Sequence, residues 1–121
     1  TLLSMLREKL STQGVLLVSF PNINSRWKSM MGRRWPGYYW PYHKVVFSER
    51  GFHHVAKKAS LRVVDTVTHE TPVLGAWLQT FGLKGMLPTF LSLVFMVYQS
   101  VCLAIHRRGA ESIAMTLRKD D

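Results

Sequence analysis

The sequence is poor in the side chains that build disulfides, catalytic centres and metal sites. Cys102 is its single cysteine, which excludes an intramolecular disulfide. His69 and Glu70 begin like a zinc-protease motif, but no second histidine stands four residues after the first. The seven acids form no recognisable general acid–base pair, and the sequence has no glycine-rich phosphate loop. We therefore expect no enzymatic activity, no cofactor and no bound metal.

Acidic residues are scarce throughout. Seven Asp and Glu stand against 16 Lys and Arg, which gives a formal charge of +9, and Glu8 is the single acid among the first 48 residues. This balance favours an anionic partner, which can be an anionic lipid, a nucleic acid or an acidic protein surface. Because 47% of the residues are apolar, the composition excludes a disordered basic tail.

Charge is absent altogether from residues 86–105. As a helix these twenty residues would be about 30 Å long, which matches the hydrocarbon core of a bilayer. Lys84 bounds one end, and His106, Arg107 and Arg108 bound the other. A buried core helix is the alternative, but a helix that is apolar on all sides must be surrounded on all sides. The rest of so short a chain could hardly do that, so we predict a membrane-spanning helix.

The polar residues of this run share one side of the predicted helix. Thr89, Ser92, Gln99 and Ser100 fall within an arc of roughly 100°, and Met96 lies in the same arc. Small and polar side chains favour contacts between helices in lipid, so we predict that this stripe contacts helices of neighbouring subunits. Hydroxyls can instead bond back to their own backbone. Gln99 favours the partner interpretation, because an unpaired amide is costly in hydrocarbon.

An amphipathic helix is predicted before the run. Ser48 is suited to cap it, and apolar residues recur at helical spacing from Phe52 to Val67, so we expect the helix to cover Phe52–His69. Lys57, Lys58 and Arg62 lie outside the apolar arc. We expect this helix to lie on a membrane surface or on a partner subunit, with its cations toward anionic headgroups.

Three shorter elements complete the prediction. Thr1–Leu10 can form a short amphipathic helix, with its leucines on one side. Gly14–Phe20 is apolar and short, and could be a buried strand or an extended arm. Thr71 and Pro72 are typical of the N-cap and first position of another short helix, which we expect to reach about Leu83.

An aromatic segment between these elements is interrupted by prolines and cannot be a regular helix. Its aromatic residues and the two arginines before them are Arg33, Arg34, Trp35, Tyr38, Tyr39, Trp40 and Tyr42. Such residues suit a lipid headgroup layer or a protein interface, and they can also stack on single-stranded RNA. With a spanning helix in the same chain, we assign them, together with Arg107 and Arg108, to headgroup or subunit contacts.

The fold expected from these patterns is mainly α, with one transmembrane helix, amphipathic helices and an irregular aromatic-rich segment. Residues 1–47 would form a basic arm and residues 48–85 amphipathic helices. Residues 86–105 would span the membrane, and residues 106–121 would form a polar C-terminal tail.

Four basic residues follow the span closely, whereas Lys84 alone precedes it closely. The local charge rule then puts the carboxyl terminus in the matrix or cytoplasm. The region before the span holds 12 of the 16 basic residues and could reverse this orientation.

In layout the chain resembles a supernumerary single-pass subunit of a mitochondrial inner-membrane complex, either a respiratory complex or the ATP synthase. The resemblance is one of composition and arrangement over the whole chain, and complex I is favoured because it has the most such subunits. It implies a non-catalytic subunit that stabilises its complex and contacts other subunits and anionic phospholipid such as cardiolipin. The alternative is a basic nucleic-acid-binding protein such as a mitochondrial ribosomal subunit, against which the uncharged run argues.

Overall fold

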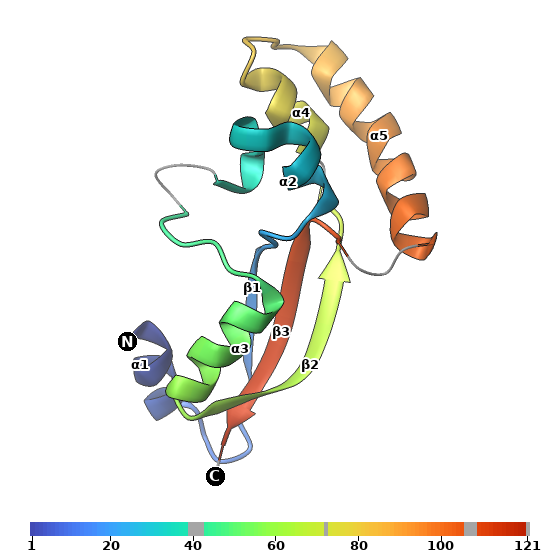
Figure 1. Ribbon diagram of the computed structural model, residues 1–121. Helices are drawn as coiled ribbons and strands as arrows, with labels where there is room; N and C mark the ends of the chain where they lie inside the picture. The colour runs from blue at the N-terminus through green and yellow to red at the C-terminus, as the bar shows by residue number, and fades with distance from the viewer. Residues whose placement is uncertain (39–42, 72, 106–108, 121) are drawn as a thin grey trace.

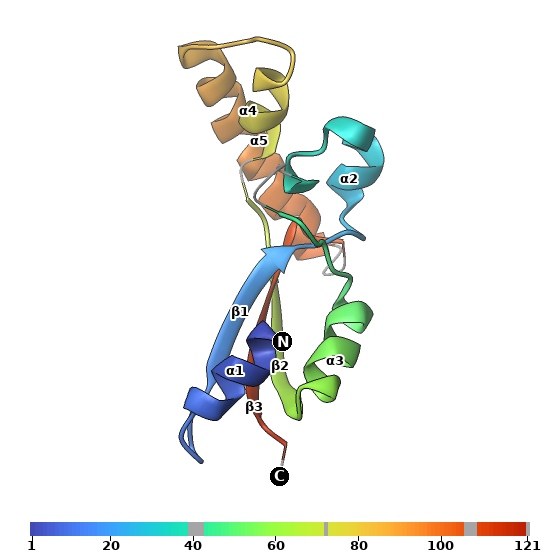
Figure 2. The same cartoon turned by 90° about the vertical axis from the view of Figure 1, so that its left-hand side faces the viewer.

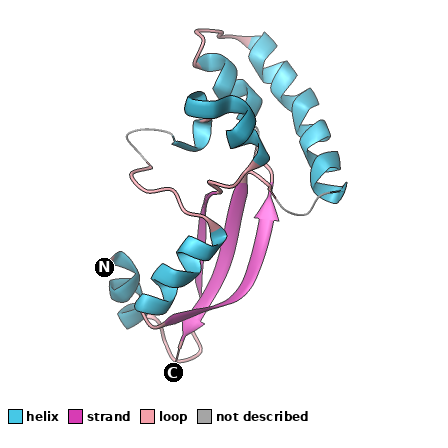
Figure 3. Ribbon diagram, viewed as in Figure 1, coloured by secondary structure: helices cyan, strands magenta, loops and turns pink. Residues whose placement is uncertain are grey.

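The computed structural model describes residues 1–38, 43–71, 73–105 and 109–120, and its fold is mixed α/β (Figures 1 and 3). The described residues form a three-stranded antiparallel sheet, several helices and two short 3-10 turns. In chain order the elements are α1 (Leu2–Lys9), β1 (Leu16–Pro21), α2 (Arg26–Met31), η1 (Gly32–Arg34), η2 (Pro36–Tyr38), α3 (Glu49–Lys58), β2 (Leu61–His69), α4 (Val73–Gln79), α5 (Met86–Ile105) and β3 (Ser112–Lys119).

The sheet has the order β1-β3-β2, with the last strand of the chain at its centre. Ile113, Met115 and Leu117 alternate along β3, and each is at most 1% exposed. Because alternate residues of a strand point to one face, all three pack into the same core, against Phe52 and Ala56 of α3. The helix α1 packs against this core through Leu3.

The prediction of a mainly α fold is wrong, and its largest error is the helix expected over Phe52–His69. The helix α3 starts after its N-cap Ser48, as predicted, but it ends at Lys58, and Ser60 takes a positive φ of 52°. The strand β2 follows at once. Its segment is rich in β-branched residues, which suit a pleated sheet better than a helix. The apolar spacing continued into β2 by coincidence.

The second error concerns residues 106–121, which were expected to form a polar tail. They contain β3, which pairs with both other strands. Large apolar residues stand at every second position from Ile113 to Leu117, which is the strand signal that the prediction overlooked. Of the two alternatives left open for Gly14–Phe20, the structure has the strand, as β1, which starts at Leu16 and extends to Pro21.

Beyond one end of the sheet, α2, α4 and α5 enclose a second core (Figures 1 and 2). Trp27, Met31, Trp35 and Val73 are buried there, and Phe95 of α5 packs against them. The segment between β2 and β3 forms a helical hairpin of α4 and α5, with positive φ at Gly82 and Gly85 in its turn. The helix α5 covers the residues predicted for it, 86–105.

Candidate functional site

The most conspicuous surface of the molecule is the outer side of α5. Met86, Val97 and Ile105 are 89%, 65% and 69% exposed, although all three are large and apolar. Among the described residues, α5 is the one helix long and apolar enough to cross a membrane. Within its most apolar 18-residue stretch, 17% of the residues are buried by the rest of the chain. An exposed apolar surface of this length in water is a liability that a lipid phase or a partner removes. The surface therefore marks a site of contact.

The opposite side of α5 is covered by the chain itself. Pro88, Ser92 and Gln99 are buried, and Phe95 lies between the last two in the sequence. Ring contacts fix this side, since the ring centroids of Trp27 and Phe95 lie 4.9 Å apart in an edge-on arrangement. Buried positions that recur every three or four residues face one direction on a helix. The chain therefore covers α5 along one stripe.

Close packing between α4 and α5 depends on small side chains. A Cβ placed on Gly75 would lie 3.2 Å from both Cβ and Oγ of Ser92. Small residues at such crossings let two helix backbones approach. Through this contact the predicted polar stripe meets a helix of the same chain.

We expect Gly75→Leu to separate α4 from α5 and to destabilise the hairpin by about 1–3 kcal/mol, the usual cost of overpacking. Hydrogen exchange in detergent micelles measures the loss as faster exchange of the α4 amides. Gln79→Leu, at an exposed position of the same helix, adds a similar side chain without a clash and should leave exchange unchanged. Equal exchange in both variants would contradict the contact.

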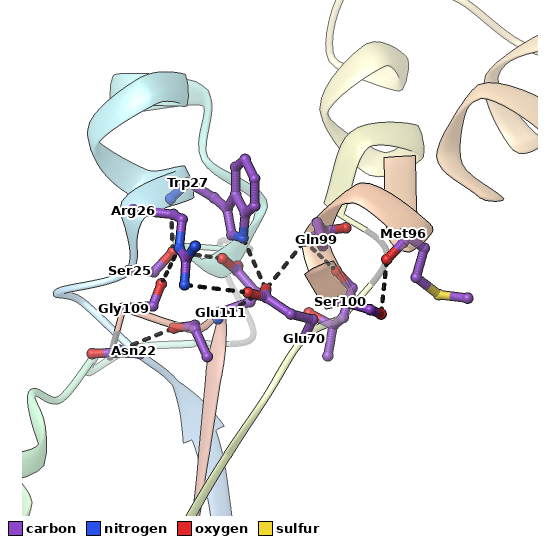
Figure 4. A network of polar contacts seen from close by, with 12 residues as sticks. Asn22, Ser25, Arg26, Trp27, Glu70, Met96, Gln99, Ser100, Gly109 and Glu111 are labelled. Carbon is purple, nitrogen blue, oxygen red and sulfur yellow. Dashed lines mark hydrogen bonds and ion pairs between the residues drawn. The ribbon is translucent and has the colours of Figure 1, made fainter. Parts of the chain in front are cut away.

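A polar network joins the C-terminal part of α5, at Gln99, to the end of the sheet (Figure 4). Glu70 directly follows β2, and its Oε2 accepts hydrogen bonds from Trp27 Nε1 at 2.8 Å and from Gln99 Nε2 at 3.2 Å. Gln99 Nε2 also donates to the Thr71 carbonyl at 3.1 Å. Arg26 Nη2 lies 4.0 Å from Glu70 Oε1. One carboxylate thus holds together α2, α5 and the end of β2.

A second carboxyl group lies beside the first. Glu111 is 2% exposed and precedes β3. Its Oε1 accepts from Trp35 Nε1 at 2.6 Å, and its Oε2 accepts from Ser25 Oγ at 2.8 Å. Its backbone N–H donates to Glu70 Oε2 at 3.3 Å. Burial, helped by the nearby charge of Glu70, raises the pKa of Glu111 to about 7, against the hydrogen bonds from Ser25 and Trp35, which lower it. This group can exchange a proton near neutral pH.

The predicted stripe of α5 is divided by the structure. Ser92 and Gln99 face the chain's own α4 and Glu70 rather than being left for a neighbouring subunit. Ser100 Oγ donates to the Met96 carbonyl, and Thr89 Oγ1 donates to the Gly85 carbonyl. These two hydroxyls bond back to their own helix backbone, which is the alternative that the sequence left open. Met96 and Ser100 line a cleft between α5 and β2.

The aromatic and basic residues are also divided. Trp35 is 1% exposed in the second core, so it is not placed at a lipid or subunit surface, and Tyr38 packs beside it. Arg33 is exposed, and the Arg34 guanidinium lies 4.3 Å from the ring centroid of Phe81. The other residues predicted for this surface, Tyr39, Trp40, Tyr42, Arg107 and Arg108, lie outside the described residues.

The three cations predicted on the amphipathic helix lie far from α5. Lys57, Lys58 and Arg62 are exposed, and they occupy the end of α3 and the start of β2, at the end of the sheet remote from α5 (Figures 1 and 2). A membrane in contact with α5 is therefore not held by these three side chains. No grouping of three or more His, Cys, Asp or Glu that could hold a metal occurs within the described part of the chain.

Sequence reasoning missed the two glutamates of the network as functional residues. They stand on either side of the uncharged run in a chain that has few acids, with Glu70 before it and Glu111 after it. That position was the available signal. Comparisons with protein-family models, with curated proteins and with solved structures find no match to this chain.

Proposed function

We propose that this chain is a non-catalytic accessory protein of a membrane assembly and that α5 attaches it to the bilayer. The observation that carries the proposal is the uncovered apolar side of α5, which extends from Met86 to Ile105. Lipid removes such a surface from water at a gain of roughly 25 cal/mol per Å². The net charge of +9 supports contact with anionic phospholipid such as cardiolipin.

The proposal in its fuller form assigns the assembly to the mitochondrial inner membrane, as a respiratory complex or the ATP synthase, with complex I first among them. That assignment rests on the resemblance in layout. Native electrophoresis of detergent-solubilised membranes, with mass spectrometry of what migrates with the chain, tests it. Migration at the mass of a large membrane complex supports the fuller proposal, and migration as a lone chain overturns it.

Extraction at alkaline pH tests the attachment itself. We expect the chain to stay with carbonate-washed membranes. We also expect it to float with vesicles in which about one fifth of the phospholipid is anionic. Release of the chain into the wash, with no flotation, would overturn the proposal. Recovery of the released chain with RNA would favour the nucleic-acid-binding alternative.

A further inference from the structure

We propose that α5 lies in the plane of a single membrane leaflet, with the rest of the described chain on one side of the bilayer. The inference rests on the proposed membrane attachment and deepens it, because it states how α5 meets lipid. It replaces the single-pass topology that the sequence predicts. Three separate observations carry it.

The first observation is the pairing of the strands on either side of the α4–α5 hairpin. His69 at the end of β2 is opposite Ser112 at the start of β3. The pairing continues to Leu61 and Lys119, and beyond it the Asp120 N–H donates to the Ser60 carbonyl at 3.1 Å. Separating these strands would leave the ladder of backbone groups unpaired, which is costly. The flanks of the hairpin therefore lie on the same side of any bilayer.

The second observation is the depth of the arginines. The Arg34 guanidinium lies over the ring of Phe81, which follows α4 at the tip of the hairpin. If the hairpin stood upright in the bilayer, Arg34 would be carried inward with the tip, together with Arg33. An arginine at the bilayer centre costs at least about 2.5–3.5 kcal/mol. A hairpin that lies flat keeps both cations at the level of the headgroups.

The third observation is the distribution of cover along α5. The buried residues on its inner side run from Pro88 near one end to Gln99 near the other, facing α4, α2 and the end of the sheet. The uncovered side runs equally far, through Met86, Val97 and Ala104. A helix covered lengthwise on one side fits an interface, where one side meets acyl chains and the other side meets a polar layer. In this chain the remainder of the fold provides that second layer.

The occupant of the uncovered side is then a leaflet that contains anionic phospholipid. Two exposed cations flank the α4–α5 hairpin, where headgroup phosphates can meet them. Lys84 is exposed in the turn before α5, and Arg33 is exposed on η1. Basic side chains near a membrane surface contribute about 1 kcal/mol each to binding anionic lipid.

Cysteine labelling tests the sidedness. In a chain with Cys102→Ala, single cysteines are placed at Lys57 before the hairpin, at Lys84 in its turn, and at Arg118 after it, all exposed positions. Sealed vesicles that carry the chain receive a membrane-impermeant maleimide, before and after permeabilisation. We expect all three cysteines to react from the same side. If the cysteines at positions 57 and 118 react from opposite sides, the single-pass topology is correct. If only the cysteine at position 84 reacts from the opposite side, the α4–α5 hairpin crosses the bilayer and returns.

Depth measurement tests the orientation independently. Nitroxide labels at Met86, Val97 and Ala104 lie within roughly 20° of one another around the helix. Relaxation by lipid-soluble oxygen and by a water-soluble nickel complex gives the depth of each. We expect similar shallow depths, about 5–10 Å below the headgroups, for all three. A label at position 97 much deeper than both others would overturn the in-plane orientation.

The two proposals fail in distinguishable ways. If the chain resists carbonate extraction but labels from opposite sides or shows a deep centre, the attachment stands and the in-plane orientation is wrong. If carbonate releases the chain and the chain also fails to float with vesicles, the attachment is wrong and the orientation falls with it.

Discussion

Arginine at both Val94 and Val97 is expected to release the chain from membranes while leaving its fold intact. These valines lie near the middle of α5 and are 56% and 65% exposed, so neither substitution disturbs a packed core. Each arginine replaces an apolar contact with a cation that must stay hydrated. The penalty is about 2.5–3.5 kcal/mol per arginine at full depth and less near an interface. We therefore expect vesicle partitioning at least about tenfold weaker, measured by flotation.

A matched control separates this effect from added charge. Val15 and Val45 are 52% and 64% exposed and lie outside α5. Arginine at both positions adds the same charge and removes the same number of methyl groups. We expect this control to float as the parent does, or slightly better on anionic vesicles. If both double variants float equally well, α5 is not the membrane contact, and both proposals above lose their support.

The residues 86–105 were predictable as a helix because nothing in the sequence competes with that interpretation. Twenty residues without charge leave one regular structure that satisfies every backbone group away from water. The covered stripe of α5 was not predictable to the same degree. Gln99 and Ser92 were predicted to contact helices of neighbouring subunits, but in the structure Gln99 donates to Glu70 and Ser92 packs against Gly75, both in the same chain.

Two strands of the sheet, β2 and β3, were missed because the stronger patterns beside them, the helical spacing of α3 and the long apolar run, were followed instead. The strand β3 is central, yet Ser112–Lys119 ends in basic residues and follows the apolar run, so it was taken as a tail. The apolar spacing of α3 continues into the strand β2. The helix gives way to the strand at Ser60, which has a positive φ although it is not a glycine, so the sequence carries no signal of the break. Long-range pairing between β2 and β3 cannot be found from local periodicity.

The network at the C-terminal part of α5 depends on this missed pairing. Glu70 and Glu111 are 41 residues apart in the sequence, and they meet because β2 and β3 pair at His69 and Ser112. Without the sheet, nothing in the sequence brings the two acids together. Trp35, which donates to Glu111, was assigned to a lipid or subunit surface for the same reason, since its core forms only around the hairpin.

Glu111 should dominate the pH dependence of this protein's stability. Its pKa lies near 7 in the folded chain, above its ordinary value of 4.5, so the folded chain holds this proton more tightly than the unfolded chain does. Between pH 4.5 and about 7 the free energy of unfolding must then fall as the pH rises. The full loss is about 3 kcal/mol, at one pKa unit per 1.36 kcal/mol. It is complete above pH 7.

Glu111→Gln should remove this dependence, because an amide stays neutral at every pH and its oxygen can still accept from Trp35. We expect the variant to match the parent near pH 5 and to exceed it by about 1–3 kcal/mol at pH 8, in urea unfolding in micelles followed by circular dichroism. Glu8→Gln, which removes an exposed acid from α1, should keep the parent's slope. A parent slope that persists in Glu111→Gln would place the proton elsewhere.

Ionisation of Glu111 should also loosen the C-terminal part of α5, since the ionised carboxylate faces Glu70, which accepts a hydrogen bond from Gln99. Amides near Gln99 should therefore exchange faster at pH 8 than at pH 5 in the parent, after correction for intrinsic rates, but not in Glu111→Gln.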